Sequence, residues 1–189
     1  NSAENEKTGR VIKCGLAIID IISQDHLKLL STLLQLKNSN AYVSNEVDID
    51  ALWNFFFESG FIYPEKYHYV QENKDTIKKT YEKIYTQNAS IARHFVYQNK
   101  GAIAGHLAMI RFYENTWLIH HHAARTPTSF KAGLVVLDQI GQFSNNSHNL
   151  YSGHMNYLIC YCRPENKFPN RVVGGAAGAI NDTNKCCIE

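Results

Sequence analysis

The sequence predicts an α+β fold in which a central, mostly antiparallel mixed sheet is flanked by helices. One observation is a run of three strand-like segments, residues 90–98, 102–112 and 116–124, joined by short polar turns typical of consecutive hairpins. The other is that amphipathic helical segments lie before and after this run, and that a fourth strand-like segment follows at residues 155–162.

Length and composition indicate one globular domain. A chain of 189 residues with 44% hydrophobic and 19% charged residues can bury a sizeable core. A net charge of +2 with scattered Lys and Arg argues against a nucleic-acid partner. The longest apolar run, residues 15–22, is far shorter than the ~20 residues of a membrane span. Five cysteines without a C-x-x-C pair favour the cytoplasm.

The N-terminal segment is expected to contribute one strand and one helix. Residues 11–22 are β-branched and apolar, which predicts a buried strand. Ser23 is placed to cap a helix over residues 24–37, because Ser favours the N-cap position. Its leucines share one helical face: Leu27, Leu30 and Leu34.

Two further helices are predicted before the hairpins, after a short strand at residues 41–43. The helix over residues 48–59 has apolar side chains at the spacing of one face and ends at Gly60. Its apolar positions are Ile49, Leu52, Trp53 and Phe56. In the helix over residues 75–86, the buried face is formed by Ile77, Tyr81, Ile84 and Tyr85.

After the hairpins, an amphipathic helix is predicted over residues 130–143. The strand at 155–162 is followed by a small-residue helix over 172–180 and a last short strand at 185–188. We divide the chain into an N-terminal strand-helix extension, residues 1–40, and a main domain, residues 41–189.

Three consecutive histidines end the second hairpin strand. Alternation along a strand places His120 and His122 on one face and His121 on the other. They are interpreted as polar residues of a cleft, as a general base near neutral pH, or as zinc ligands with a third from His94 or His106. Because no carboxylate accompanies them in this segment, we expect no metal.

The loop after the histidines is a candidate anion site. It opens a helix, where backbone N–H groups and the helix dipole favour negative charge. Arg125 and Lys131 add positive charge, and Ser129 is a natural N-cap. Neither G-x-x-x-x-G-K-[ST] nor G-x-G-x-x-G is present, so the nucleotide-binding folds with those motifs are not supported. The alternative is a well-capped helix without a ligand.

Other candidate groups lie in the segment after this helix. Tyr157 can donate a proton, and Cys160 is either a nucleophile or, more often in such a strand, an inert apolar residue. No G-x-S-x-G occurs, so a serine hydrolase elbow is absent from the sequence.

The order of these elements resembles the GNAT-type N-acyltransferase superfamily, and most closely its divergent bacterial branch that includes long-chain N-acyl amino acid synthases. The resemblance covers residues 41–189. It is carried by Gly-Phe-Ile-Tyr-Pro-Glu-Lys at residues 60–66, the hairpin through His122, the loop and helix at 125–143, and Asn166 before a small-residue helix.

This resemblance implies transfer of an acyl group from an acyl thioester, on coenzyme A or acyl carrier protein, to a small amine acceptor. The donor's arm would run between the strand ending at His122 and the strand at 155–162. His121 or His122 would act as base and Tyr157 as acid. The implied cofactor-binding residues are Ala123, Ala124, Arg125, Ser129, Lys131, Ala132, Gly133 and Asn166.

The loop 125–133 lacks the Q/R-x-x-G-x-G/A pattern typical of that superfamily. An alternative is therefore a catalytically degenerate, GNAT-like ligand-binding or regulatory module, and a further one is a metal hydrolase built on the histidines. The superfamily's layout implies one more strand after the last one predicted here. We expect the open edge to be completed by a longer chain, by a second copy in a homodimer, or by residues 11–22.

Overall fold

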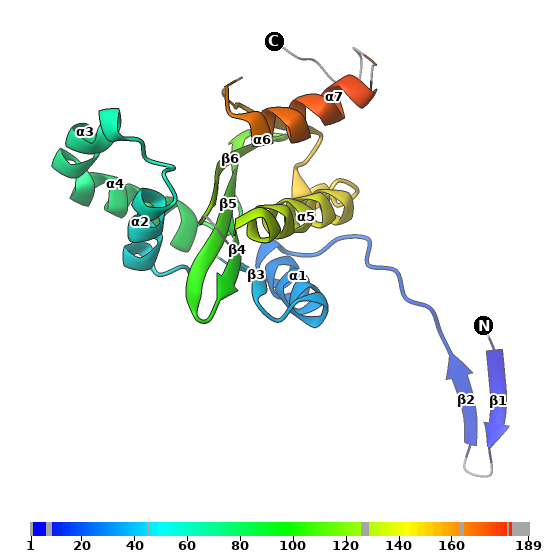
Figure 1. The fold of residues 1–189 in the computed structure, drawn as a ribbon. Helices are drawn as coiled ribbons and strands as arrows, with labels where there is room; N and C mark the ends of the chain where they lie inside the picture. Colours follow the sequence, from blue (N-terminus) through cyan, green and yellow to red (C-terminus); the bar gives the residue numbers. More distant parts are fainter. Residues whose placement is uncertain are drawn as a thin grey trace.

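The fold is known from a computed structural model, which describes residues 2–6, 9–44, 46–125, 129–162, 165–180 and 182 (Figure 1). Its strands are β1 (Ser2–Glu6), β2 (Gly9–Lys13), β3 (Ala41–Ser44), β4 (Ala92–Asn99), β5 (Ala102–Tyr113), β6 (Thr116–Ala124) and β7 (Tyr157–Cys160). Its α-helices are α1 (Ser23–Lys37), α2 (Ile49–Glu58), α3 (Tyr67–Glu72), α4 (Lys74–Tyr81), α5 (Ser129–Ser147), α6 (Lys167–Pro169) and α7 (Gly175–Ile180).

Among the described residues, the main sheet has five strands in the order β3-β4-β5-β6-β7. The first three pairings are antiparallel, and β7 runs parallel to β6. The prediction of a mostly antiparallel mixed sheet flanked by helices is therefore confirmed.

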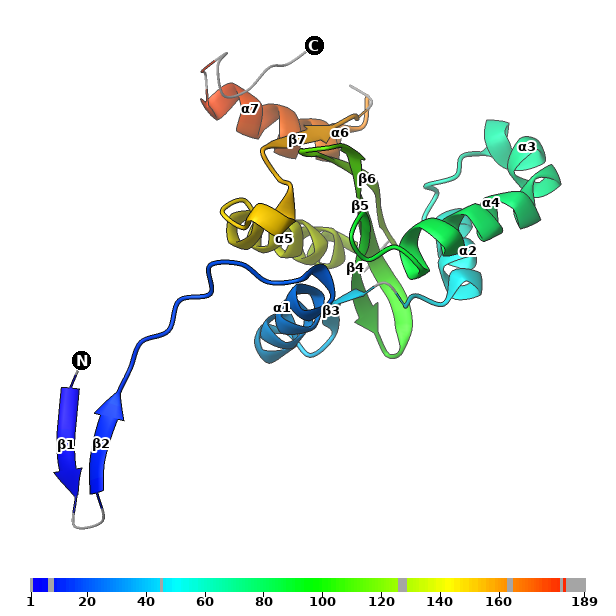
Figure 2. The same ribbon diagram turned by 180° about the vertical axis from the view of Figure 1, so that it is seen from behind.

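The sheet is covered on both faces (Figures 1 and 2). Helices α1 and α5 cover one face, where Leu30 and Val136 pack with Phe95 of β4 in the larger core cluster. Helix α2 covers the other face, where Phe56 packs with Val96. Because α1 contributes to the larger core, part of the predicted N-terminal extension packs directly on the sheet.

The periodicity of the helices before the hairpins is confirmed. The carboxylate of Asp48 accepts hydrogen bonds from the first-turn amides of α2, and Gly60 follows its end with a φ of 72°, which glycine adopts readily. The predicted helix over residues 75–86 consists of α4 and a π-helical turn, Glu82–Thr86. The sequence analysis missed α3, which lies in the segment after Pro64.

The prediction of a buried strand over residues 11–22 is wrong. Strand β2 ends at Lys13 and, within the described part of the chain, pairs with β1 alone, in a hairpin that stands apart from the sheet (Figures 1 and 2). Residues 14–22 form no regular element, and Leu16 and Ile19 are 96% and 88% exposed. A short apolar run becomes a buried strand only where a sheet offers it a partner strand, and no described strand of the main sheet pairs with these residues.

Some element boundaries also differ. Helix α1 begins at Ser23 itself, Ile22 occupies the cap position, and no side chain caps the helix. The strand predicted at 155–162 is limited to β7, and the small-residue helix consists of the π-helical turn Asn170–Gly174 followed by α7. The strand predicted at 185–188 lies outside the described residues. None of the described helices has the length and apolar character needed to cross a membrane.

Candidate functional site

The end of β6 contains a β-bulge. His106 pairs with Ala123 and Ala108 pairs with His120, so Leu107 of β5 faces the two residues His121 and His122. His121 has a φ of 54°, in the left-handed region that is uncommon for a non-glycine residue. The extra residue interrupts the alternation of faces.

The predicted placement of the histidines is therefore wrong. His120 and His121 lie on the same face of the sheet, with ring centroids 4.0 Å apart, and His122 lies on the opposite face. Strict alternation would have grouped His120 with His122, but the bulge places one extra residue between His120 and Ala123.

The bulge lies just beyond the point where β6 and β7 part. The two strands pair from Thr116 with Tyr157 to Ile119 with Cys160, and residues 120–124 have no partner in β7. Tyr157 therefore lies at the opposite end of the paired stretch from the bulge, and it is 68% exposed. The structure does not bring Tyr157 together with the histidines.

His121 is enclosed by aromatic side chains. The Tyr81 hydroxyl is hydrogen-bonded to its Nδ1 atom, and the rings of Phe56 and Phe61 lie 5.8 and 5.3 Å from the imidazole, edge to face. Burial, with smaller contributions from His120 and His106, holds the pKa of His121 well below its usual value. Burial likewise raises the pKa of Tyr81 well above 10. Both groups are therefore neutral at pH 7.

A second pair of histidines lies behind the bulge. Nδ1 of His94 lies 2.7 Å from Nε2 of His106, and Nδ1 of His106 lies 3.1 Å from the carbonyl oxygen of His121. Both imidazoles are fully buried. Burial lowers the pKa of His94 to about 3 and that of His106 well below 6.5. This chain of hydrogen bonds anchors the backbone of the bulge.

Tyr85 makes the corresponding contact to the first histidine of the run. Its hydroxyl is hydrogen-bonded to Nε2 of His120, whose pKa burial lowers to about 4. Tyr81 and Tyr85 thus belong to the candidate site, whereas the sequence pattern placed them only on a buried helix face. The π-helical turn that contains Tyr85 is a feature frequent at functional sites. Among the described residues, no group of three or more His, Cys, Asp or Glu side chains is arranged to hold a metal ion.

His122 faces the start of α5. Its ring lies 5.4 Å from that of Phe168, and its Nε2 atom lies 3.7 Å from where a Cβ on Gly133 would stand. This Nε2 atom is buried and has no hydrogen-bond partner among the described residues. Burial lowers the pKa of His122 below its usual value. A mostly buried imidazole next to the backbone of Gly133 thus lies on the face opposite His121.

The structure separates the residues of the candidate anion loop. The guanidinium of Arg125 forms an ion pair with Glu58 at the end of α2, and its amide donates to the carbonyl of Ala104 at 2.9 Å. Lys131 is exposed near the start of α5, whereas Ala132 is fully buried. Lys131 is thus the cation of this group that is not engaged by a carboxylate in the described structure.

The remaining predicted cofactor-binding residues surround this region. Ala123 is buried in the core beneath α2, and Ala124 lies against Gly133. Asn166 precedes α6 and is exposed. Ser129, predicted as the N-cap, is instead the first residue of α5, and its side chain is not among those that the structure describes.

Gly105 was missed by the sequence analysis. A Cβ atom at this position would lie 2.9 Å from the carbonyl oxygen of Ala132, so glycine allows the first turn of α5 to approach β5 closely. An isolated glycine within a strand pattern is the signal that could have revealed this approach.

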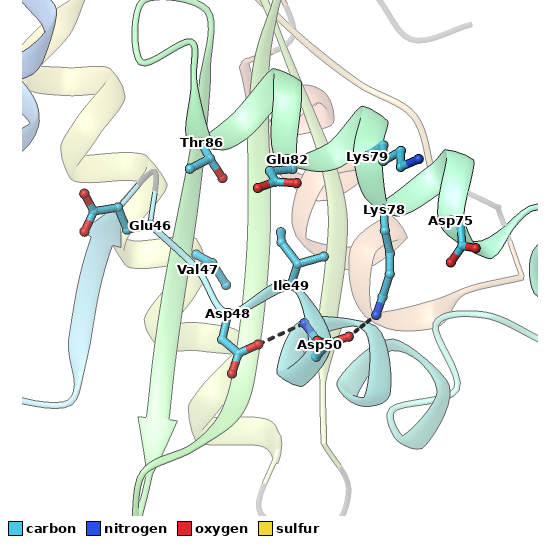
Figure 3. Close-up of a pocket in the computed structure, with 10 residues that line it drawn as sticks. All are labelled: Glu46, Val47, Asp48, Ile49, Asp50, Asp75, Lys78, Lys79, Glu82 and Thr86. Atoms are coloured by element: carbon cyan, nitrogen blue, oxygen red, sulfur yellow. Dashed lines mark hydrogen bonds and ion pairs between the residues drawn. The ribbon is translucent and has the colours of Figure 1, made fainter.

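Two cavities adjoin on the α2–α4 face. The larger, of about 670 Å³, lies between the segment before α2 and helix α4, and Figure 3 shows the Lys78 ammonium pointing to Asp50 within it. Its charged lining residues are Glu46, Asp48, Asp50, Asp75, Lys78, Lys79 and Glu82. The smaller cavity, of about 140 Å³, is mostly apolar and has His121 and Tyr81 in its wall. Ile49 and Lys78 line both cavities.

No family model matches the sequence, and no curated protein matches it at a significant level. The fold, however, is similar to solved acetyltransferase structures. One is a PaiA N-acetyltransferase from Thermoplasma acidophilum in complex with coenzyme A, with 14% identity, a TM-score of 0.52, and coverage of 75% of this chain and 87% of that one.

Two further structures show the same likeness. Diaminobutyrate acetyltransferase from Paenibacillus lautus, with L-2,4-diaminobutyric acid and coenzyme A, has 12% identity, a TM-score of 0.51, and coverage of 75% of this chain and 76% of that one. An aminoglycoside acetyltransferase from an uncultured soil sample, in complex with trehalose, has 12% identity and the same TM-score, with coverage of 73% and 88%. The chain therefore has the fold of GNAT acetyltransferases.

Proposed function

We propose that this protein transfers an acyl group from an acyl thioester to an amine, with His121 as the general base. The observation that carries the proposal is the bulge of β6. It turns the His121 and His122 rings to opposite faces of the sheet next to the point where β6 and β7 part. The likeness of the fold to acetyltransferases supports it.

In the proposed reaction, the amine nitrogen attacks the thioester carbonyl, a C–N bond forms, and the C–S bond breaks to release a thiolate, which then takes up a proton from solvent. Nε2 of His121 takes the proton that leaves the nitrogen. A phenol can donate or accept, so the hydrogen bond between Tyr81 and Nδ1 persists whichever nitrogen carries the proton. Burial keeps the ring neutral at pH 7, as a base must be.

We propose a coenzyme A thioester as the donor, with an acyl carrier protein thioester as the alternative. Such a group supplies the activated acyl carbonyl. Lys131 and the start of α5, together with Ser129, Ala132, Gly133 and Asn166, would hold its phosphates, and the unpaired edge of β6 would bond its extended arm. The solved neighbours from Thermoplasma and Paenibacillus contain coenzyme A, which supports this choice of donor.

The finer expectations belong to the same proposal. We infer a small-molecule acceptor, a cytoplasmic location and a relationship to the bacterial branch that includes N-acyl amino acid synthases. The homodimer is also kept as a prediction, because β7 is an edge strand among the described residues.

One observation favours a second function, a ligand-binding module without turnover. The Arg125 guanidinium, expected to bind phosphate, is engaged by Glu58 instead. A protein that retained the fold but lost the charge needed to hold a donor productively would bind a ligand without transferring its acyl group.

The test compares binding with turnover. Thermal shift is measured with free coenzyme A, acetyl- and long-chain acyl-coenzyme A, and acyl carrier protein, and thiol release is followed with a panel of amines. We expect stabilisation by at least one donor and amine-dependent thiol release. The His121→Ala variant should lose ~10²-fold or more in kcat with little change in donor affinity. No stabilisation by any donor would overturn the proposal, and stabilisation without thiol release would favour the binding module.

A further inference from the structure

The smaller cavity offers almost pure hydrocarbon to a ligand. It is walled by Leu52 and Phe56 of α2, Phe61 of the loop that follows, and Ile77 of α4. Two of the polar groups in its lining are already engaged: the Lys78 ammonium with Asp50, and the Tyr81 hydroxyl with His121. The His121 imidazole is therefore the group in this wall that is placed to exchange a proton with a ligand.

The size of the cavity limits what it accepts. At about 140 Å³, it is close to the 150 Å³ cavity that binds benzene when lined by Leu, Ile and Phe. Each methylene of an apolar group that becomes buried there should tighten binding about four-fold.

The cavity and the candidate donor groups lie on opposite faces of the sheet. Phe56, Tyr81 and the cavity belong to the α2–α4 face, whereas His122 and Gly133 belong to the α5 face. A thioester held near the start of α5 would present its carbonyl at the bulge. The cavity beside His121 is then left for the other reactant.

We propose that this cavity selects the acyl acceptor, and that the acceptor is a primary amine bearing one compact apolar group no larger than a benzyl group. The proposal rests on the proposed acyl transfer. The apolar group fills the cavity and the nitrogen lies beside Nε2 of His121. The nitrogen's proton passes to that atom as the C–N bond forms, and the donor's sulfur leaves as a thiolate that solvent protonates.

The first test needs no donor. Ethylamine, isobutylamine, benzylamine and 2-naphthylmethylamine are titrated calorimetrically into the full chain near pH 9, with 1,4-diaminobutane as a dicationic comparison. We expect affinity to rise from ethylamine to benzylamine by at least ten-fold and to fall again for the naphthyl amine. Affinity independent of size, or tighter binding of the diamine, would overturn the proposal; the second outcome would place the acceptor in the acid-lined cavity.

A variant pair sharpens the test. Phe61→Ala enlarges the cavity and should move the tightest binding from benzylamine to the naphthyl amine. Phe57→Ala, near the end of α2 and outside the cavity lining, should leave the size order unchanged. If Phe61→Ala does not fold, the amine series measured on the unmodified chain still tests the proposal.

The acyl chain is the rival occupant. If the cavity belongs to the acceptor, decanoyl-coenzyme A should leave benzylamine affinity within about two-fold, and displacement of benzylamine by it would overturn the proposal. Amine binding that depends on size without thiol release would overturn the proposed acyl transfer but support the selectivity of the cavity. Thiol release at a rate independent of amine size would support acyl transfer and overturn the role of the cavity.

Discussion

His94 and His106 are joined by a buried hydrogen bond of 2.7 Å between Nδ1 of the first and Nε2 of the second. The Nδ1 atom of His106 faces a carbonyl oxygen, that of His121, which can only accept, so Nδ1 of His106 carries the proton. Its Nε2 atom then accepts from Nδ1–H of His94. Both imidazoles are thus neutral, each with one assigned tautomer. Their chain of hydrogen bonds ends at His121, the residue of the bulge with a left-handed backbone conformation.

The coupling of this pair can be measured. His106→Leu should lower the free energy of unfolding by ~1–3 kcal/mol, because it leaves buried polar groups at His94 and His121 without a partner. Adding His94→Leu should cost much less than His94→Leu alone, since it removes the donor that His106→Leu left unpaired. Urea unfolding of the four proteins of the cycle gives the coupling energy, and strictly additive effects would argue against the hydrogen bond.

Acid should destabilise the protein as the pH falls below about 6.5. The pKa of His94 is about 3 and that of His120 about 4, whereas the unfolded chain takes up these protons near pH 6.5. Between these values only the unfolded state is protonated, so stability is complete above pH 6.5 and is lost toward pH 4. Each such histidine contributes up to about 1.4 kcal/mol per pH unit.

A matched pair of variants tests whether buried histidines cause this loss of stability in acid. His120→Gln removes one of these proton-binding differences and should flatten the dependence of the unfolding free energy on pH. His68→Gln, which removes an exposed histidine of α3, is the control. Equal slopes for both variants and the unmodified protein, measured by urea unfolding from pH 7.5 to 5, would rule out His120 as a contributor.

Gly105→Ala should push α5 away from β5. Its Cβ would meet the Ala132 carbonyl oxygen at 2.9 Å, and backbone on a packed helix cannot yield cheaply. We expect a loss of ~1–3 kcal/mol in unfolding free energy and weaker donor binding. Gly141→Ala, on the same helix with no atom within 4 Å of the new Cβ, should instead stabilise by ~1 kcal/mol. Similar effects at both positions would disprove the close approach.

Charge near the start of α5 should control donor affinity. Arg125→Ala combined with Lys131→Ala should weaken coenzyme A binding by ~1–3 kcal/mol if these charges contact its phosphates. Glu58→Gln should strengthen it by releasing Arg125 from its ion pair. Calorimetric titration checks both, with Lys28→Ala on α1 as the control. Unchanged affinity in the double variant would place the phosphates elsewhere.

Local pattern was enough to predict most of the fold. The observed bounds of α2 agree closely with the helix predicted over residues 48–59. That prediction needed only the spacing of apolar residues along a helix and a glycine after its end, which adopts a positive φ. The hairpin strands β4, β5 and β6 were predicted from strand-like segments joined by short polar turns, which are also local features. Residues 11–22 failed because apolar β-branched composition cannot reveal whether a sheet edge is available.

The candidate site could likewise be predicted from the sequence only in part. The sequence by itself placed three histidines at the end of a strand and a helix start after them, because residue order along the chain determines both. Only the tertiary structure decided which ring faces which side, since a bulge appears when two strands pair with unequal numbers of residues. It also decided that Tyr81, forty residues before His121, would hold its imidazole and turn the histidine run into an enclosed, neutral site.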